Sequence, residues 1–129
     1  MSRTSQGRCL CGDVSFEVHG DPIWVGHCHC ETCRRGAGAP LVTFAGYRNN
    51  QWAWTKATPS VYVSSPGAKR YFCARCGSSV AFESVRFPDE FHFHVALFDT
   101  PEDLEPNELF HAEERLKWMP ALMPGCLAR

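Results

Sequence analysis

Hydrophobic and polar residues alternate with a period of two along much of the chain. Val14, Phe16 and Val18 alternate with polar residues, which is the pattern of a half-buried β-strand. Further runs rich in β-branched or aromatic residues are bounded by Gly, Pro or Asn-Asn, and they lie at 23–25, 41–44, 51–55, 60–64, 69–72, 79–83 and 91–98. The runs between 41 and 64 suggest a meander of strands. The pattern predicts a mainly β protein of antiparallel sheets.

Three segments depart from the strand pattern. Residues 34–40, Arg-Arg-Gly-Ala-Gly-Ala-Pro, are so rich in glycine that at most one helical turn could form, and we expect a loop. Residues 99–103, Asp-Thr-Pro-Glu-Asp, predict a helical turn, because proline is tolerated at the first helical positions. Residues 108–114 fit either a strand or a short helix.

Length and composition are those of an ordinary single domain, with 129 residues of which 44% are hydrophobic and 21% charged. We expect residues 1–6 to be a flexible lead-in, 7–125 to be the domain, and 126–129 to be a C-terminal tail. No apolar run approaches the ~20 residues that a membrane-spanning helix needs. Residues 1–8 are polar and lack the apolar segment of a secretory signal, so we expect a cytoplasmic protein.

Charge argues against nucleic acid as a partner, because 13 Lys and Arg residues are balanced by 14 Asp and Glu residues and no block of like charge occurs. The cysteines change the picture more. There are eight, at Cys9, Cys11, Cys28, Cys30, Cys33, Cys73, Cys76 and Cys126. In a reducing compartment, cysteines at such short spacings favour metal binding over disulfides.

Two of the cysteine motifs have the form of half-sites for zinc. Cys9-x-Cys11 and Cys73-x-x-Cys76 are each followed by glycine, which can take the positive φ of a tight turn. Together they supply four sulfurs, the closed set typical of structural zinc. The alternative is that these four cysteines are buried or redox-active without a metal.

The remaining cluster, Cys28-x-Cys30-x-x-Cys33, has three sulfurs. One interpretation is a second structural site completed by His27, His29 or a distant histidine. The other is a zinc with three thiolates and a fourth position open to water or substrate, which is the feature that separates catalytic from structural zinc. Sequence spacing alone leaves both open. Cys126 we expect to be a free thiol.

Charged and titratable side chains near the cluster are candidates for further roles. Arg34 and Arg35 directly follow Cys33, so they are placed to offset the charge of three thiolates and are candidate substrate-binding residues. A general acid is not obvious, although His29, His92 or His94 would serve if one lies near the metal. In the strand 91–98, alternation should place both His92 and His94 on the face opposite to Phe91 and Phe93.

Four segments resemble one known family, the glutathione-dependent formaldehyde-activating (GFA) family, over about residues 7–118. They are C-x-C-G-x-V-x-F-E at Cys9–Glu17, H-C-H-C-x-x-C-R-R-x-x-G-A-P at His27–Pro40, R-x-F-C-x-x-C-G-S at Arg70–Ser78, and Leu97–Pro101. The resemblance implies an Mss4-like fold with two Zn²⁺ per chain. Cys9, Cys11, Cys73 and Cys76 would hold the structural ion, and Cys28, Cys30 and Cys33 the catalytic one.

The same resemblance implies a carbon–sulfur lyase. Its prototype condenses glutathione with formaldehyde to S-hydroxymethylglutathione. We therefore expect a glutathione-like thiol and an aldehyde as partners, and neither nucleic acid nor a membrane. Two other functions remain as alternatives, namely a non-catalytic, zinc-stabilised binding module and a thiol redox sensor that loses zinc and pairs two of its cysteines.

Overall fold

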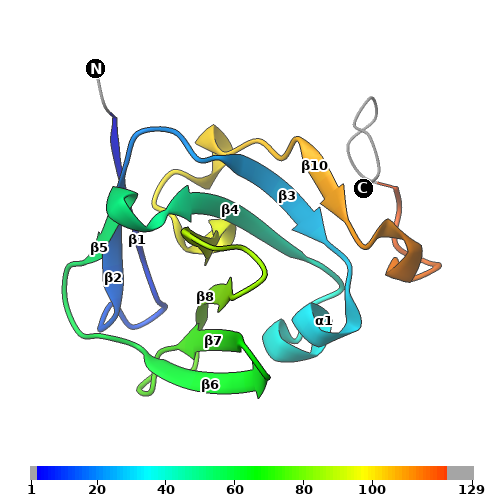
Figure 1. Cartoon of the computed structure of the whole chain (residues 1–129), viewed down its shortest axis with the longest axis horizontal. Helices are drawn as coiled ribbons and strands as arrows, with labels where there is room; N and C mark the ends of the chain where they lie inside the picture. Colours follow the sequence, from blue (N-terminus) through cyan, green and yellow to red (C-terminus); the bar gives the residue numbers. More distant parts are fainter. Residues whose placement is uncertain (1–2, 122–129) are drawn as a thin grey trace.

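The computed structural model describes residues 3–121, which form ten strands and one short α-helix (Figure 1). The strands are β1 (Thr4–Arg8), β2 (Ser15–His19), β3 (Trp24–Cys28), β4 (Val42–Arg48), β5 (Trp52–Trp54), β6 (Ser60–Ser65), β7 (Ala68–Phe72), β8 (Ser79–Ser84), β9 (Glu90–His94) and β10 (Glu108–Phe110). The helices are α1 (Glu31–Ala37) and four 3-10 turns, η1 (Asn49–Gln51), η2 (Val95–Leu97), η3 (Pro101–Asp103) and η4 (Ala112–Glu114). The predicted mainly β fold is confirmed. Cys126 and the tail lie outside the described residues.

The strands form two sheets. The small sheet has the order β1-β2-β5 and the large one β10-β3-β4-β9-β8-β7-β6. Neighbours are antiparallel, except that β10 pairs with β3 in parallel. The meander predicted between residues 41 and 64 is wrong, because β5 pairs with β2 in the other sheet and β6 pairs with β7. In Figure 1 the small sheet stands at the left, beside the large one.

Side-chain alternation gives the large sheet two different faces. Phe93 of β9 and Tyr47 of β4 enter the main core, where the Phe93 ring stacks on Phe16 of β2 with the centroids 4.2 Å apart. His92 and His94 face the other way, as predicted, and contact aromatic rings of that face. The strand itself ends at His94, four residues before the predicted end, because the chain turns into η2.

The second face of the large sheet carries a smaller apolar cluster. Two of its buried residues, Val42 and Phe44, come from β4, and the other two are the cysteines Cys28 and Cys33. Helix α1 follows β3 directly and contacts β4 in this region. The three-cysteine motif therefore lies on the opposite side of the large sheet from the main core.

Residues 4–6, predicted as part of a flexible lead-in, belong to strand β1, which pairs with β2 over its whole length. Packing explains the correction, because Gly7 leaves room for the Phe16 ring. A Cβ at Gly7 would lie 2.4 Å from Phe16 Cζ. The helical turn predicted at 99–103 is confirmed as η3, and 108–114 contains both alternatives, β10 and then η4.

The loop predicted over 34–40 is wrong for residues 34–37, because α1 continues to Ala37, whereas residues 38–40 lie outside any helix or strand. Cys30 caps the helix by accepting the amide of Cys33, and Glu31 pairs with Arg35 one turn later at 2.8 Å. The helix ends at Gly38 in the left-handed conformation, with φ 64°. Within residues 3–121, the helices are too short and too polar to cross a membrane.

Candidate metal centres

The four-cysteine set is brought together from two segments that are far apart in the chain. Cys9 and Cys11 follow β1, and Cys73 and Cys76 follow β7, yet their four sulfurs lie within 4.8 Å of one another. Each pair sits on a tight turn closed by glycine, with φ 83° at Gly12 and 82° at Gly77. The turns also meet directly, since the Leu10 amide donates to Ser78 Oγ at 3.0 Å.

The spacing of these sulfurs suits zinc. Four sulfurs at about 2.3 Å from a tetrahedral ion lie about 3.8 Å apart. Cys11 Sγ is 3.7 Å from Cys9 Sγ and 3.8 Å from Cys73 Sγ. Backbone amides point at the buried sulfurs, with Val14 N donating to Cys9 Sγ and Cys76 N to Cys73 Sγ. The donor set therefore fits a closed zinc site.

The three-cysteine set is local in sequence. Cys28 ends β3, Cys30 caps α1, and Cys33 lies in the first turn of that helix. The Cys28 thiol lies 3.5 Å from Cys30 Sγ and 3.6 Å from Cys33 Sγ. Within residues 3–121 the group that shares this spacing has three members, and it does not include a histidine. The geometry offers three ligands to a metal ion.

Cys30 is the most acidic thiol of this set. Hydrogen bonds from the Cys28 and Cys33 thiols, then from the Thr32 hydroxyl and the Cys33 amide, hold the pKa of Cys30 well below its ordinary value, although burial opposes them. The same hydrogen bonding, with Cys28 as the donor, raises the pKa of Cys28. Among three clustered thiols, the first to become a thiolate is therefore Cys30, at the N-terminus of α1.

Arg70 of β7 is the cation that contacts this set, and the sequence did not single it out for this role. Its Nη1 and Nη2 lie 3.7 and 3.8 Å from Cys33 Sγ, and Nη2 donates to Thr32 Oγ1 at 3.3 Å. The signals in the sequence were its place in the strand that leads into Cys73 and at the start of the motif R-x-F-C-x-x-C-G-S. These signals cannot indicate a contact between residues 37 positions apart.

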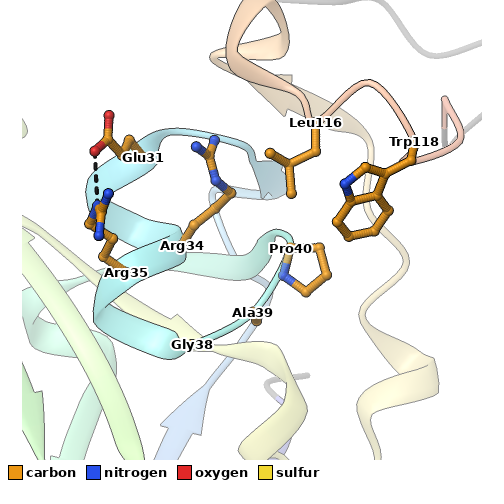
Figure 2. Close-up of a pocket in the computed structure, with 8 residues that line it drawn as sticks. All are labelled: Glu31, Arg34, Arg35, Gly38, Ala39, Pro40, Leu116 and Trp118. Carbon is orange, nitrogen blue, oxygen red and sulfur yellow. Dashed lines mark hydrogen bonds and ion pairs between the residues drawn. The ribbon is translucent and has the colours of Figure 1, made fainter.

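The two arginines that follow Cys33 point elsewhere. Arg34 donates to the carbonyl oxygens of His29 at 2.7 Å and Glu114 at 2.9 Å, and Arg35 pairs with Glu31. Both arginines line a pocket of about 380 Å³ beside α1 (Figure 2). The pocket is lined by Glu31, Arg34, Arg35, Gly38, Ala39, Pro40, Leu116 and Trp118, without the three cysteines. The substrate-binding role of Arg34 and Arg35 stays a prediction.

The histidines considered from the sequence are not members of the three-cysteine group. His27 Nδ1 is 2.7 Å from the Thr43 hydroxyl, and His29 is buried with an Nδ1 that has no hydrogen-bond partner in the described structure. His92 bonds to Glu90 at 3.0 Å. Burial, with a further contribution from Arg70, lowers the pKa of His94 to about 4. At neutral pH His94 is therefore a neutral ring and a poor general acid.

A third group of possible ligands, His111, Glu113 and Glu114, lies on η4 and is exposed to solvent. Glu114 is already engaged there, since one carboxylate oxygen accepts the Glu31 amide at 3.0 Å and the other lies 3.4 Å from His111 Nδ1. Exposed carboxylates of this kind are common without a metal. We assign no ion to this group.

Comparisons with known proteins identify a family and two similar proteins. The sequence model of one family, described as glutathione-dependent formaldehyde-activating enzyme, matches residues 4–114. A protein of Schizosaccharomyces pombe described as an uncharacterized lyase is 26% identical over 99 residues, which cover 77% of this chain and 72% of that protein. A crystal structure of a Rhodobacter sphaeroides protein is similar with a TM-score of 0.65 and 25% identity, covering 81% of this chain and 98% of the other.

Proposed function

Since this chain belongs to the glutathione-dependent formaldehyde-activating family, we propose that it is a zinc-dependent, carbon–sulfur lyase-type enzyme that joins a small thiol to an aldehyde. Glutathione and formaldehyde are the pair we propose, with S-hydroxymethylglutathione as the product. The observation that carries the proposal is the unequal number of sulfurs, four in one cluster and three in the other. A cytoplasmic location, in which glutathione keeps thiols reduced, stays a prediction.

The donor sets support two zinc ions of different kind. Cys9, Cys11, Cys73 and Cys76 would hold the structural ion in a closed shell, and Cys28, Cys30 and Cys33 would hold the catalytic ion. Zinc with three protein ligands supplies a Lewis acid with one open position, at which a thiol binds with a lowered pKa. The three sulfurs lie 3.5 to 3.6 Å apart where measured from Cys28, close to the spacing that tetrahedral zinc requires.

The proposed reaction needs no oxidant or reductant. The thiol loses its proton, its sulfur forms a bond to the aldehyde carbon, and the electron pair of the C=O π bond moves to oxygen, which takes up a proton. Because the two reactants are separate small molecules in water, most of the rate gain would come from holding them together in the right orientation. The three cysteines lie within six residues, at the end of strand β3 and in the first turn of helix α1. These two elements hold the sulfurs in a fixed arrangement, which would orient a bound thiol.

Cys30→Ser tests the proposal, with Cys126→Ser as the matched thiol control. The uncatalysed condensation also proceeds, so exchange NMR with ¹³C-formaldehyde and glutathione would measure the rate above background. We expect the wild type and Cys126→Ser to accelerate exchange and Cys30→Ser to lose the acceleration. The zinc content of Cys30→Ser should fall from two ions to one while its circular dichroism spectrum is kept. Unchanged exchange in this variant would overturn the proposal.

The same preparations separate the two other functions. A binding module predicts two equally tight zinc ions and no acceleration by any variant. A redox sensor predicts that mild oxidation releases one ion and that mass spectrometry then finds a disulfide among Cys28, Cys30 and Cys33. Loss of the Cys126 thiol should change neither result.

A further inference from the structure

Arg70 is held against the three-cysteine cluster by contacts on three sides. Its guanidinium contacts Cys33 Sγ through both terminal nitrogens and Thr32 Oγ1 through one of them. The central carbon of the guanidinium lies 4.7 Å from the centre of the Phe82 ring, at cation–π distance. Sheet register enforces this last contact, because Arg70 and Phe82 are direct partners on β7 and β8. The guanidinium is therefore fixed before any ligand arrives.

Gly36 of α1 lies against the Arg70 side chain. A Cβ at Gly36 would lie 3.4 Å from Arg70 Cδ and 3.6 Å from Nη1, which is ordinary van der Waals contact, so an alanine would fit here without displacing Arg70. The carbonyl of Gly36 also accepts the Ser79 hydroxyl at 3.2 Å, which ties α1 to the start of β8. Helix α1 is therefore packed against β7 and β8 at the point where Arg70 meets Cys33.

The positive charge of Arg70 would balance the negative charge of a metal-bound three-cysteine centre. Three thiolates and one Zn²⁺ sum to a net charge of about −1, and a thiol that binds as a thiolate adds a further negative charge. Arg34 donates to backbone carbonyls and Arg35 donates to Glu31, so the hydrogen bonds of these two arginines go to oxygen atoms and not to a sulfur. Arg70, in contrast, directly contacts the sulfur of Cys33.

We propose that Arg70 is the positioning residue of the three-cysteine centre: it aims Cys33 Sγ at the metal and balances the negative charge, so that the site retains zinc and admits an anionic thiol. The inference rests on the proposed function for the identity of the incoming thiol. Its effect on zinc retention stands on the geometry alone. Partners that orient metal ligands in this way change metal affinity by about 10- to 100-fold when removed.

Arg70→Met tests the inference, since methionine keeps an apolar stem against Phe82 while it removes the charge. Zinc release to a chromophoric chelator would be followed with the four-cysteine site in the same chain as internal reference. We expect zinc at the three-cysteine site to be held at least about tenfold more weakly, and zinc at the four-cysteine site to be unchanged. Arg70→Lys should lose less, because it keeps the charge but not the two-nitrogen contact.

Gly36→Ala is the matched control, because it changes neither a charge nor a sulfur and its new methyl group would meet Arg70 at ordinary contact distance. Zinc at both sites should therefore be held as in the wild type. If Arg70→Met does not fold, Arg70→Lys decides the question. Equal zinc affinity in the Arg70 variants and the wild type would overturn the inference, and so would an equal weakening of both sites.

The inference and the proposed function fail in different ways. If the wild type does not accelerate exchange between thiol and aldehyde but Arg70→Met still weakens zinc at one site, the proposed function fails and the role of Arg70 in zinc retention stands. If the wild type accelerates exchange and Arg70→Met binds zinc as the wild type does, the proposed function stands and the role of Arg70 in zinc retention fails.

Discussion

The two cysteine centres use the same ligand atom but are built differently. The four-cysteine centre joins segments far apart in the chain, with Cys11 and Cys73 separated by 62 positions, and its buried members Cys9 and Cys73 belong to the main core. The three-cysteine centre is local, and it belongs to the smaller cluster on the opposite face of the large sheet. A metal that closes a long loop constrains the unfolded chain, whereas one that binds a short segment does so much less.

The number of ligands and the place of the centre in the fold therefore change together. A closed centre in the core can stabilise the domain because it need not exchange a ligand. An open centre on a separate face can lose or exchange a ligand without opening the core. This division agrees with the structural and catalytic roles proposed for the two centres.

The largest expected effect concerns the loss of one sulfur from each centre. Cys73→Ser should leave the chain largely unfolded, because structural zinc contributes about 10 kcal/mol or more, comparable to the whole stability of a small domain. Cys33→Ser should remain folded with a lower Tm. Circular dichroism and thermal unfolding in zinc-containing buffer would measure both, with Cys126→Ser as the control. Equal losses of Tm in the two variants would contradict the division of roles.

The next effect concerns metal removal from the unchanged chain. A chelator should withdraw zinc in two phases, with the three-cysteine ion leaving first because it lacks a fourth protein sulfur. Tm should change little during the first phase and fall sharply in the second. A colorimetric chelator and parallel thermal scans would follow both quantities. A single phase, or a fall in Tm that accompanies the first ion, would show that the two centres are equivalent.

Local signals in the sequence were enough to predict both centres as groups of cysteines. Short spacings and the glycines at 12 and 77 specify tight turns whatever the rest of the chain does, and the turns are observed. Period-two alternation likewise predicted that Phe93 and His94 lie on opposite faces, because the direction of side chains in a strand is a local property, and the structure confirms this.

What could not be predicted depends on contacts between distant segments. Helix α1 forms despite Gly36, because Glu114 from η4 accepts the amide of Glu31 and because Arg70 packs against the glycine. The contact of Arg70 with Cys33 depends in turn on where β7 lies in the sheet. Helix propensity and cysteine spacing describe neighbours in sequence, so they predicted neither helix α1 nor the contact of Arg70 with Cys33.

A smaller effect concerns the pKa of His94, which lies on the face of the large sheet that carries the three-cysteine centre. His94 has a pKa of about 4 against an ordinary value of 6.5, so between these values the unfolded chain binds a proton that the folded chain does not. Stability from the neutral ring is therefore fully present above pH 6.5 and is lost as the pH falls towards 4. The shift corresponds to about 3 kcal/mol.

Two measurements check this expectation. Histidine NMR should find a His94 signal that stays in the neutral form down to about pH 4. Unfolding free energies at pH 7 and pH 5 should differ less in His94→Gln than in the wild type, while His19→Gln, at an exposed position, should behave like the wild type. Comparing variants at each pH cancels the effect of acid on the cysteines. Titration of His94 near pH 6.5 would mean that this face is hydrated.

The smallest expected effect concerns the link between η4 and the open centre. Glu114 accepts the Glu31 amide at the N-terminus of α1, where a carboxylate both satisfies a free N–H group and opposes the helix dipole. Glu114→Ala should lower the unfolding free energy by about 1 kcal/mol. It should also speed zinc release from the three-cysteine centre, because Cys30 caps α1 and Cys33 lies in the first turn of that helix. Glu113→Ala on the same 3-10 turn is the control and should change stability by less than about 0.5 kcal/mol. Should Glu114→Ala instead speed release from the four-cysteine centre, the two centres would be coupled through the sheet, and their separation into a structural and an open site would not hold.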